Sequence, residues 1–150
     1  MKIRTNLKQA FKRRSRGDKM SNTQLLKLIE ALESGKYQQI FGSLSMMKDN
    51  GSQCREQCFC AEGVMAELWR QDHPELAKWE ILDPDRNQSV LILRINGRRW
   101  HGVTSTIYDY FFPGPVRPDL VSMNDGEDDI YDSMTFEEIA NVLRETYLDD

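Results

Sequence analysis

Apolar side chains recur at helical spacing in the first half of the chain. The pattern i, i+3, i+4, i+7 follows the capping candidates at 21–23, and Gly35 stands where a helix end favours a residue with positive φ. A second apolar stripe predicts a helix over about residues 57–70, in which Gly63 permits the close approach of a neighbouring segment. The positions expected to be buried in these two helices are Leu25, Leu28, Ile29, Leu32, Ala61, Val64, Met65 and Leu68.

A third helix is predicted near the C-terminal end. Thr135 and Glu138 have the spacing of a capping box. The buried stripe expected behind it consists of Phe136, Ile139, Ala140, Leu143 and Tyr147. Before this helix, three prolines between 113 and 118 and the acidic run 124–132 predict irregular connections. Within that run, Asn124 and Asp125 are expected to bond their own backbone in a tight turn.

Strand patterns fall between these helices. Residues 41–47 read as a strand before a turn at 49–52, and the strongest hairpin signal joins residues 90–95 to residues 98–104 through Asn96-Gly97. Asn-Gly favours a two-residue type I′ turn, which fixes the register. The expected pairs are Ile95–Arg98, Arg94–Arg99, Leu93–Trp100, Ile92–His101 and Val90–Val103. One face then carries Leu91, Leu93, Ile95 and Trp100 toward the core, and the opposite face carries Arg94, Arg99 and His101.

These elements predict one α+β domain over residues 21–150, with about three helices packed on a small, mainly antiparallel sheet that contains the hairpin. The chain has 150 residues, of which 39% are hydrophobic, enough for one core. Apolar runs are strand-sized, which excludes a membrane-spanning helix. Three cysteines, an odd number, argue against a disulfide framework and favour a reducing compartment, so we expect a cytoplasmic protein.

Charge is divided unevenly between a basic N-terminal arm, residues 1–20, and an acidic body. The arm holds eight basic side chains and one acidic one, a local charge of +7, whereas the other 130 residues hold 12 basic and 23 acidic groups, a charge of −11. Such an arm suits a nucleic acid or an anionic surface, and a solvated tail or a true start at Met20 are the alternatives. The candidate contact residues are Lys8, Lys12, Arg13, Arg14 and Arg16.

Four short segments of the body share a pattern with other proteins. The chain reads ALESGKYQQ from residue 31, FCAEGVM from residue 59, MNDG from residue 123 and MTFEEIA from residue 134. In this order and spacing, over about residues 25–147, the segments resemble a group of small proteins common in bacteriophage genomes. The group's pattern has a second cysteine where this chain has Ala61, and an Asp where it has Asn141. A paired-cysteine site therefore does not carry over, and the arm lies outside the resemblance.

The resemblance implies a phage accessory protein, for host takeover or against host defence, in the cytoplasm of the host cell. We expect such a protein to act by binding, with a host protein or a small phosphorylated metabolite, such as a nucleotide signal of host immunity, as its partner. The alternative is a nucleic-acid-binding regulator that uses the basic arm. The sequence leaves the oligomeric state open.

The hairpin offers the main candidate binding residues. Arg94 and Arg99, directly opposite one another, would repel, and His101 is expected on the same face. Guanidinium groups bind phosphate and carboxylate in a bidentate manner, so this face predicts an anion site, which Lys36 joins if the fold brings it there. The alternative is that the arginines extend into water or pair with carboxylates of the body.

Other chemistry finds little support in the sequence. Cys54, Cys58 and Cys60, with His73 or His101, do not have the spacing of paired zinc knuckles, so we expect no metal. The chain lacks a nucleophile elbow and the glycine-rich phosphate motifs, so we expect no enzymatic activity and no cofactor. The acidic run 124–132 lacks the spacing of an EF-hand and reads as a solvated loop.

Overall fold

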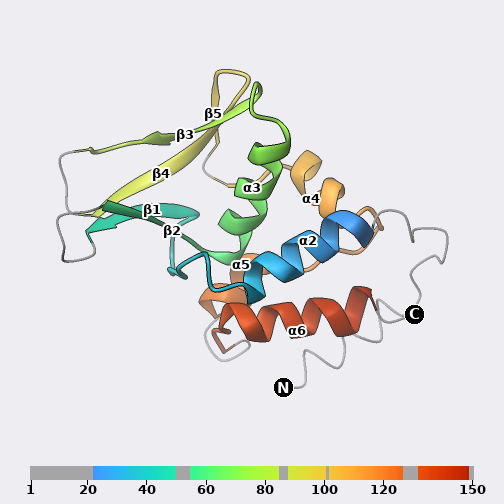
Figure 1. Cartoon of the computed structure of the whole chain (residues 1–150). Coiled ribbons are helices and arrows are strands. Elements are labelled where there is room, and N and C mark those ends of the chain that lie inside the picture. Colours follow the sequence, from blue (N-terminus) through green and yellow to red (C-terminus); the bar gives the residue numbers. More distant parts are fainter. Residues whose placement is uncertain (1–21, 50–54, 85–87, 101, 127–131, 149–150) are drawn as a thin grey trace.

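The computed structural model describes residues 22–49, 55–84, 88–100, 102–126 and 132–148, which form an α+β fold (Figure 1). These residues contain five helices and a five-stranded antiparallel sheet. The helices are α2 (Asn22–Glu33), α3 (Ala61–Asp72), α4 (Ser105–Phe111), α5 (Leu120–Asp125) and α6 (Phe136–Tyr147). The strands are β1 (Ser45–Asp49), β2 (Arg55–Phe59), β3 (Ala77–Ile81), β4 (Gln88–Ile95) and β5 (Arg98–Trp100).

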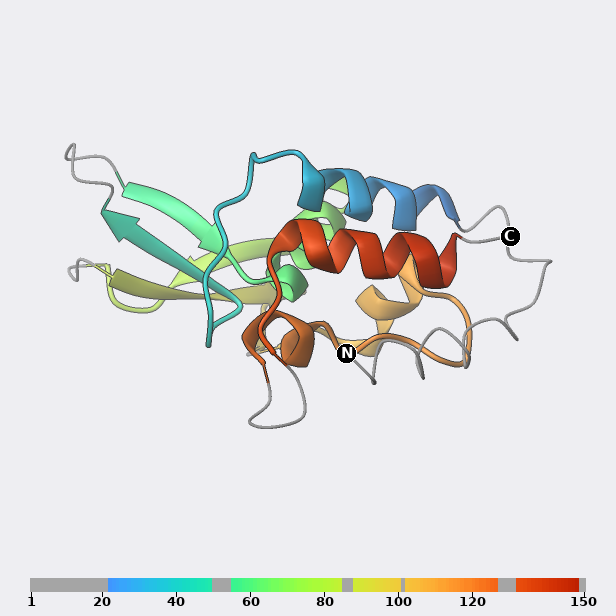
Figure 2. The same ribbon diagram turned by 90° about the horizontal axis from the view of Figure 1, so that it is seen from below.

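The sheet extends away from the group of helices (Figures 1 and 2). Its strand order is β2-β1-β4-β3, and β5 pairs with β4 beyond the start of β1. The odd-numbered residues of β4, such as Leu91 and Leu93, share one face with Trp79 and Phe59, and this face meets α3. The even-numbered residues of β3 and β4 lie on the opposite face.

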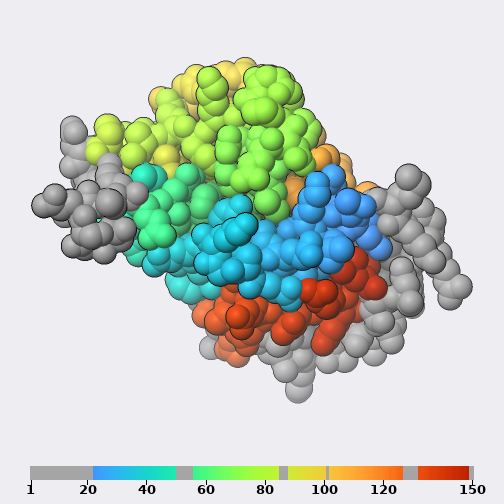
Figure 3. All heavy atoms as spheres, in the orientation of Figure 1, coloured from blue at the N-terminus to red at the C-terminus, as the bar shows by residue number. Residues whose placement is uncertain are grey.

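The helices enclose the main core. α2 and α6 lie side by side along their lengths (Figure 2), and the surface of α2 forms a band between α3 and α6 (Figure 3). All four predicted core positions of α2 and all five of α6 are buried, as their spacing requires. Gly35 has φ 77° just after α2, and the Thr135–Glu138 capping box forms in full at the start of α6. These predictions are confirmed.

The close approach expected at Gly63 is also confirmed. A Cβ at this position would lie 2.0 Å from the carbonyl oxygen of Leu44, so only glycine fits where α3 passes the start of β1. The predicted helix over 57–70 begins too early, however. Residues 57–59 belong to β2 and pair with β1, and the helix starts only after Cys60, whose thiol accepts a hydrogen bond from the Gly63 N–H at 3.4 Å.

The described residues contain more helices and strands than the sequence predicts. The prediction of about three helices is wrong, because α4 and α5 lie between the predicted hairpin and the predicted C-terminal helix, where no helix was expected, and β3 was not predicted. Residues 41–44 precede β1 rather than belonging to it. Short elements of five to seven residues show too few turns of periodicity to stand out, and tertiary packing stabilises them here.

The hairpin differs from its expected extent. Asn96 and Gly97 have φ values of 52° and 79°, as a type I′ turn requires, and Arg94 lies opposite Arg99. β5 ends at Trp100, however, so the expected Val90–Val103 pair is wrong, and Val90 pairs with Met46 of β1.

The two faces of the hairpin are also less distinct than predicted. Trp100, expected in the core, is 38% exposed, because the short β5 lies at the end of the sheet away from α2 and α6 (Figure 1). Ile92, expected on the outer face, is 2% exposed. Its predicted partner His101 lies outside the described residues. Throughout the described ranges, no helix combines the length and the apolar character needed to cross a membrane.

Candidate functional site

Three basic side chains form a row across three strands at the turn end of the sheet. Lys78 of β3 lies opposite Arg94 of β4, which in turn lies opposite Arg99 of β5. All three project from the face opposite α3, and the arginine side chains are 39% and 55% exposed. Like charges directly opposite one another destabilise a sheet, so this row, which we call the basic row, costs stability.

One carboxylate partly neutralises the basic row. Glu80 of β3 forms an ion pair with Arg99, whose Nε lies 2.7 Å from a carboxylate oxygen, and it accepts hydrogen bonds at 3.3 Å from Nη2 of both Arg94 and Arg99. The hydrogen bond from Arg99, together with both positive charges, lowers the pKa of Glu80. Arg94 also donates to the carbonyl oxygen of Gly97 at 3.0 Å, which holds its guanidinium beside the turn. Three cations and one carboxylate leave a net charge of about +2 on a body that is otherwise acidic.

A hollow of about 380 Å³ lies beside the basic row. Its lining residues are Glu75, Leu76, Lys78, Arg94, Asn96 and Gly97. This volume lies within the range of small-molecule sites, and both a lysine and an arginine border it. Since each guanidinium has five N–H donors, Arg94 retains donors beyond those given to Glu80 and Gly97.

The structure keeps part of the predicted anion site together. Arg94 and Arg99 lie side by side as expected, but they also pair with a carboxylate, which was the alternative interpretation. Lys36 lies exposed in the segment between α2 and β1, and nothing in the described residues links its side chain to the basic row. His101 and the arm residues Lys8, Lys12, Arg13, Arg14 and Arg16 lie outside the described residues.

Lys78 and Glu80 were not among the predicted site residues, because strand β3 was not predicted. The signal was present: Ala77, Trp79 and Ile81 alternate with the two charged residues, which is the period-two pattern of a strand with one buried face. Only the sheet order, with β3 beside β4, places this strand next to the arginines.

A second polar centre lies at the start of α3, where four distant segments meet. The Asn124 side chain accepts from the Ala61 N–H at 3.0 Å and from Gln39 Nε2 at 2.8 Å, and it donates to the carbonyl oxygen of Ile40 at 2.9 Å. Gln39 in turn accepts from the Phe136 N–H at the start of α6. We call this set the Asn124 junction. The expectation that Asn124 bonds its own backbone in a turn is wrong, because residue 124 lies in α5 and reaches across the fold.

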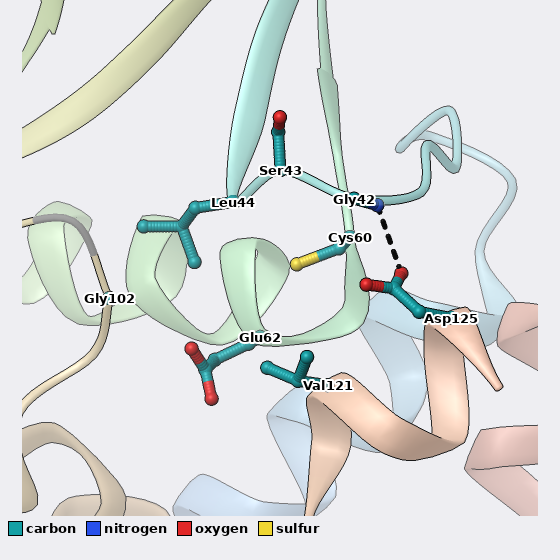
Figure 4. A pocket seen from close by; sticks show the side chains of 8 residues that line it. All are labelled: Gly42, Ser43, Leu44, Cys60, Glu62, Gly102, Val121 and Asp125. Carbon is teal, nitrogen blue, oxygen red and sulfur yellow. Dashed lines mark hydrogen bonds between the residues drawn. The ribbon is translucent and has the colours of Figure 1, made fainter. Parts of the chain in front are cut away.

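A pocket of about 230 Å³ adjoins the Asn124 junction (Figure 4). The segment before β1, the start of α3, α5 and the segment between β5 and α4 contribute its lining, which consists of Gly42, Ser43, Leu44, Cys60, Glu62, Gly102, Val121 and Asp125. Burial raises the pKa of the Cys60 thiol to about 12. The hydrogen bond from the Gly63 N–H lowers this pKa, but its effect is smaller than that of burial. A thiol with this pKa supplies almost no thiolate near neutral pH, so it serves as a helix cap rather than as a nucleophile.

The carboxylates at this pocket are held by structural bonds. Glu62 is 8% exposed, and Tyr108 donates a hydrogen bond to it at 2.6 Å. Burial raises the pKa of Glu62, and the bond from Tyr108 opposes that rise. Asp125 accepts from the Gly42 N–H at 3.1 Å and from the Asn124 side chain at 2.8 Å. Both groups therefore join segments of the fold.

Cysteine and histidine side chains do not gather around a metal in the described ranges. Within them, no group of three or more His, Cys, Asp and Glu side chains is placed to hold an ion. Cys58 and Cys60 are free and buried, and burial raises the pKa of Cys58 as well. Cys54 and His101, which the zinc interpretation also used, lie outside those ranges.

No family model matches this chain, and comparisons with curated proteins and with solved structures found no match either.

Proposed function

We propose that this protein acts by binding a small phosphorylated ligand at the basic row. The observation that carries the proposal is the row itself: Lys78, Arg94 and Arg99 stand side by side on three strands, with one carboxylate among them. Such a row destabilises the sheet, and an anionic ligand would relieve the repulsion. Two effects would therefore favour binding: the contacts that the ligand itself makes, and the reduced repulsion among the three cations.

The hollow beside the row favours a small ligand. Arg94 and Lys78 border its 380 Å³, and Leu76 adds an apolar surface for a base or another flat group. Phosphate oxygens would accept from the guanidinium N–H groups that Glu80 leaves free. Glu80 holds the arginines in place before the ligand arrives, which lowers the entropy lost on binding.

The resemblance to phage proteins gives this proposal a biological setting. A phage accessory protein that binds a nucleotide signal of host defence would withhold that signal from its receptor. The sequence also implies a second class of partner, a host protein that would contact the acidic body. Binding of a nucleotide by the purified protein alone distinguishes these two.

The test is a binding survey with the full chain. Inorganic phosphate, pyrophosphate and a panel of linear and cyclic nucleotides are screened by thermal shift, and any ligand found is measured by calorimetry. We expect Arg99→Gln to weaken binding at least about tenfold, because a guanidinium bond to phosphate contributes on this scale. The matched control is Arg144→Gln, which removes an arginine of similar exposure that pairs with Glu33 between α6 and α2.

Glu80→Gln sharpens the test. This substitution removes the negative charge from the basic row but keeps an oxygen that accepts from the arginines. If the row is an anion site, Glu80→Gln should bind the ligand more tightly than the unmodified protein. The proposal is wrong if no phosphate compound binds, or if Arg144→Gln weakens binding as much as Arg99→Gln does. Binding of nucleic acid that falls steeply with salt and disappears on deletion of residues 1–20 would instead support the arm.

A further inference from the structure

Among the residues that the structure describes, strand β3 leaves one edge of the sheet open. β3 is the last strand in the order β2-β1-β4-β3, and Figure 1 shows it at the margin of the sheet. The opposite margin is different, because residues 38–40 bond Phe59 at the end of β2 through two backbone hydrogen bonds. Over the described residues, β3 has only β4 beside it.

The hydrogen-bond pattern identifies which backbone groups face outward. Asn96 N–H donates to the Leu76 carbonyl and Leu82 N–H donates to the Val90 carbonyl, so even-numbered residues of β3 bond to β4. The N–H and C=O groups of Trp79 and Ile81 therefore point away from the sheet, and no described residue bonds them. Ala77 offers its carbonyl there, since its N–H donates to His73.

We propose that two copies of this chain associate through antiparallel pairing of their β3 strands, with Trp79 at the two-fold axis. In this register Trp79 exchanges two backbone hydrogen bonds with Trp79 of the second copy, and Ile81 N–H donates to the Ala77 carbonyl of the second copy. Lys78 then lies directly opposite Glu80 of the second copy, and the same pair forms again on the other side of the axis. Opposite charges at facing positions stabilise a sheet.

The charges select this register over its neighbours. Pairing must match outward-facing residues with each other, so the register changes in steps of two. A shift in one direction places Lys78 opposite Lys78, and a shift in the other places Glu80 opposite Glu80. Only pairing about Trp79 sets the lysine against the glutamate twice.

Side chains next to the charged pairs fit the same register. Leu82, which is 43% exposed, comes to lie opposite Leu76 of the second copy, and exposed Val90 is its neighbour on β4. Pairing farther along would set Glu75 against Asp83, which limits the contact to about the span of β3. Exposed edge strands tend to pair with other strands unless something covers or interrupts them. In this proposal a second copy of the chain covers β3.

The inference does not rest on the proposed function, although it bears on the same face. A pair of β3 strands would join the two basic rows into one surface with six cations and two carboxylates. Substitution of Ile81 leaves Lys78, Arg94 and Arg99 in place, so association and ligand binding can fail separately.

The test measures association of the full chain by sedimentation at concentrations from about 10 µM to about 1 mM. A dimer with a small interface should form within this range of concentration. Ile81→Pro removes an outward N–H that β4 does not use, and it should weaken association at least about tenfold. The control Ile81→Val keeps the N–H and should leave association unchanged. Lys78→Glu should weaken association about tenfold, and the double swap Lys78→Glu/Glu80→Lys should restore it.

Amide exchange of the unmodified protein provides a readout that needs no variant. The N–H groups of Trp79 and Ile81 should become protected as the concentration rises, whereas that of Glu80, which faces β4, should be protected throughout. A protein that is monomeric at every concentration overturns the proposal. Two other results would also overturn it. One is association that Ile81→Pro leaves unchanged, and the other is protection of the Trp79 and Ile81 N–H groups that does not depend on concentration.

Discussion

The Asn124 junction and the basic row place polar groups under opposite conditions. At the junction, Asn124 bonds groups 63 and 84 positions away in the chain, and it is fully buried. In the basic row, Arg94 and Arg99 share one carboxylate, Glu80, and the exposed Lys78 lies opposite Arg94. Buried polar groups cost free energy unless each has a partner, so the junction is a closed set that holds the fold. The row is not balanced in this way, and for this reason we propose it as the place where an anionic ligand binds.

The largest effect is expected beside the junction, at Gly63. A Cβ there would lie 2.0 Å from a backbone oxygen of Leu44, so Gly63→Ala must separate α3 from the start of β1. We expect a loss of at least about 4 kcal/mol in the free energy of unfolding, measured by urea denaturation. Gly102→Ala, where a Cβ meets nothing within 4 Å, is the matched control. A loss below about 1 kcal/mol for Gly63→Ala would contradict the close contact.

Asn124→Ala should have the next largest effect. It leaves the Ala61 N–H and the Ile40 carbonyl without their partners inside the protein. Each such group costs about 1–3 kcal/mol, so the free energy of unfolding should fall by about 3 kcal/mol. Val121→Ala, on the exposed side of the same helix, should change it by less than about 1 kcal/mol. Similar losses for both variants would mean that the junction does not hold these segments.

Glu62→Gln tests whether the burial of Glu62 at the pocket makes the free energy of unfolding depend on pH. Burial raises the pKa of Glu62, so above pH 4.5 the folded protein retains a proton that the unfolded chain has released. The free energy of unfolding should therefore fall as the pH rises through this window, and Glu62→Gln should reduce that fall while keeping the bond from Tyr108. Denaturation at several values between about pH 5 and about pH 8 measures the slope. An unchanged slope would remove Glu62 as its source.

Glu67 provides a control of opposite sign on the same helix. Burial alone would raise the pKa of Glu67, but hydrogen bonds from Arg70, Gln71 and Trp79 outweigh it and lower that pKa. Its contribution to stability is present above pH 4.5 and is lost as the pH falls through the lowered pKa. Glu67→Gln should therefore act at acidic pH, outside the window of Glu62.

The smallest stability effect is expected in the basic row. Arg99 is 55% exposed and its pair with Glu80 is exposed to solvent, so Arg99→Gln should change the free energy of unfolding by less than about 1 kcal/mol. Ligand binding, by contrast, should respond strongly to the same variant. If Arg99→Gln destabilised the protein as much as Asn124→Ala, the row would be part of the structural framework and the contrast between the two regions would fail.

Long periodic segments were predictable from the sequence alone. The buried stripes of α2 and α6, the capping box at Thr135 and the small residue required at Gly63 all depend on local spacing or on a single side chain. Hydrophobic period and capping chemistry act within a few residues, so they can be read from neighbouring positions. The cationic pair Arg94–Arg99 also follows from a local signal, the Asn-Gly turn.

Only the tertiary structure decided which polar side chains meet one another in the basic row and in the Asn124 junction. Strand order brought Lys78 and Glu80 to the arginines, although β3 lies more than ten residues before them in the chain. It also placed Trp100 at an exposed end of the sheet and moved Asn124 from an expected turn to the meeting point of four segments. Contacts between distant segments depend on how whole elements pack, and packing is a property of the assembled core rather than of local spacing.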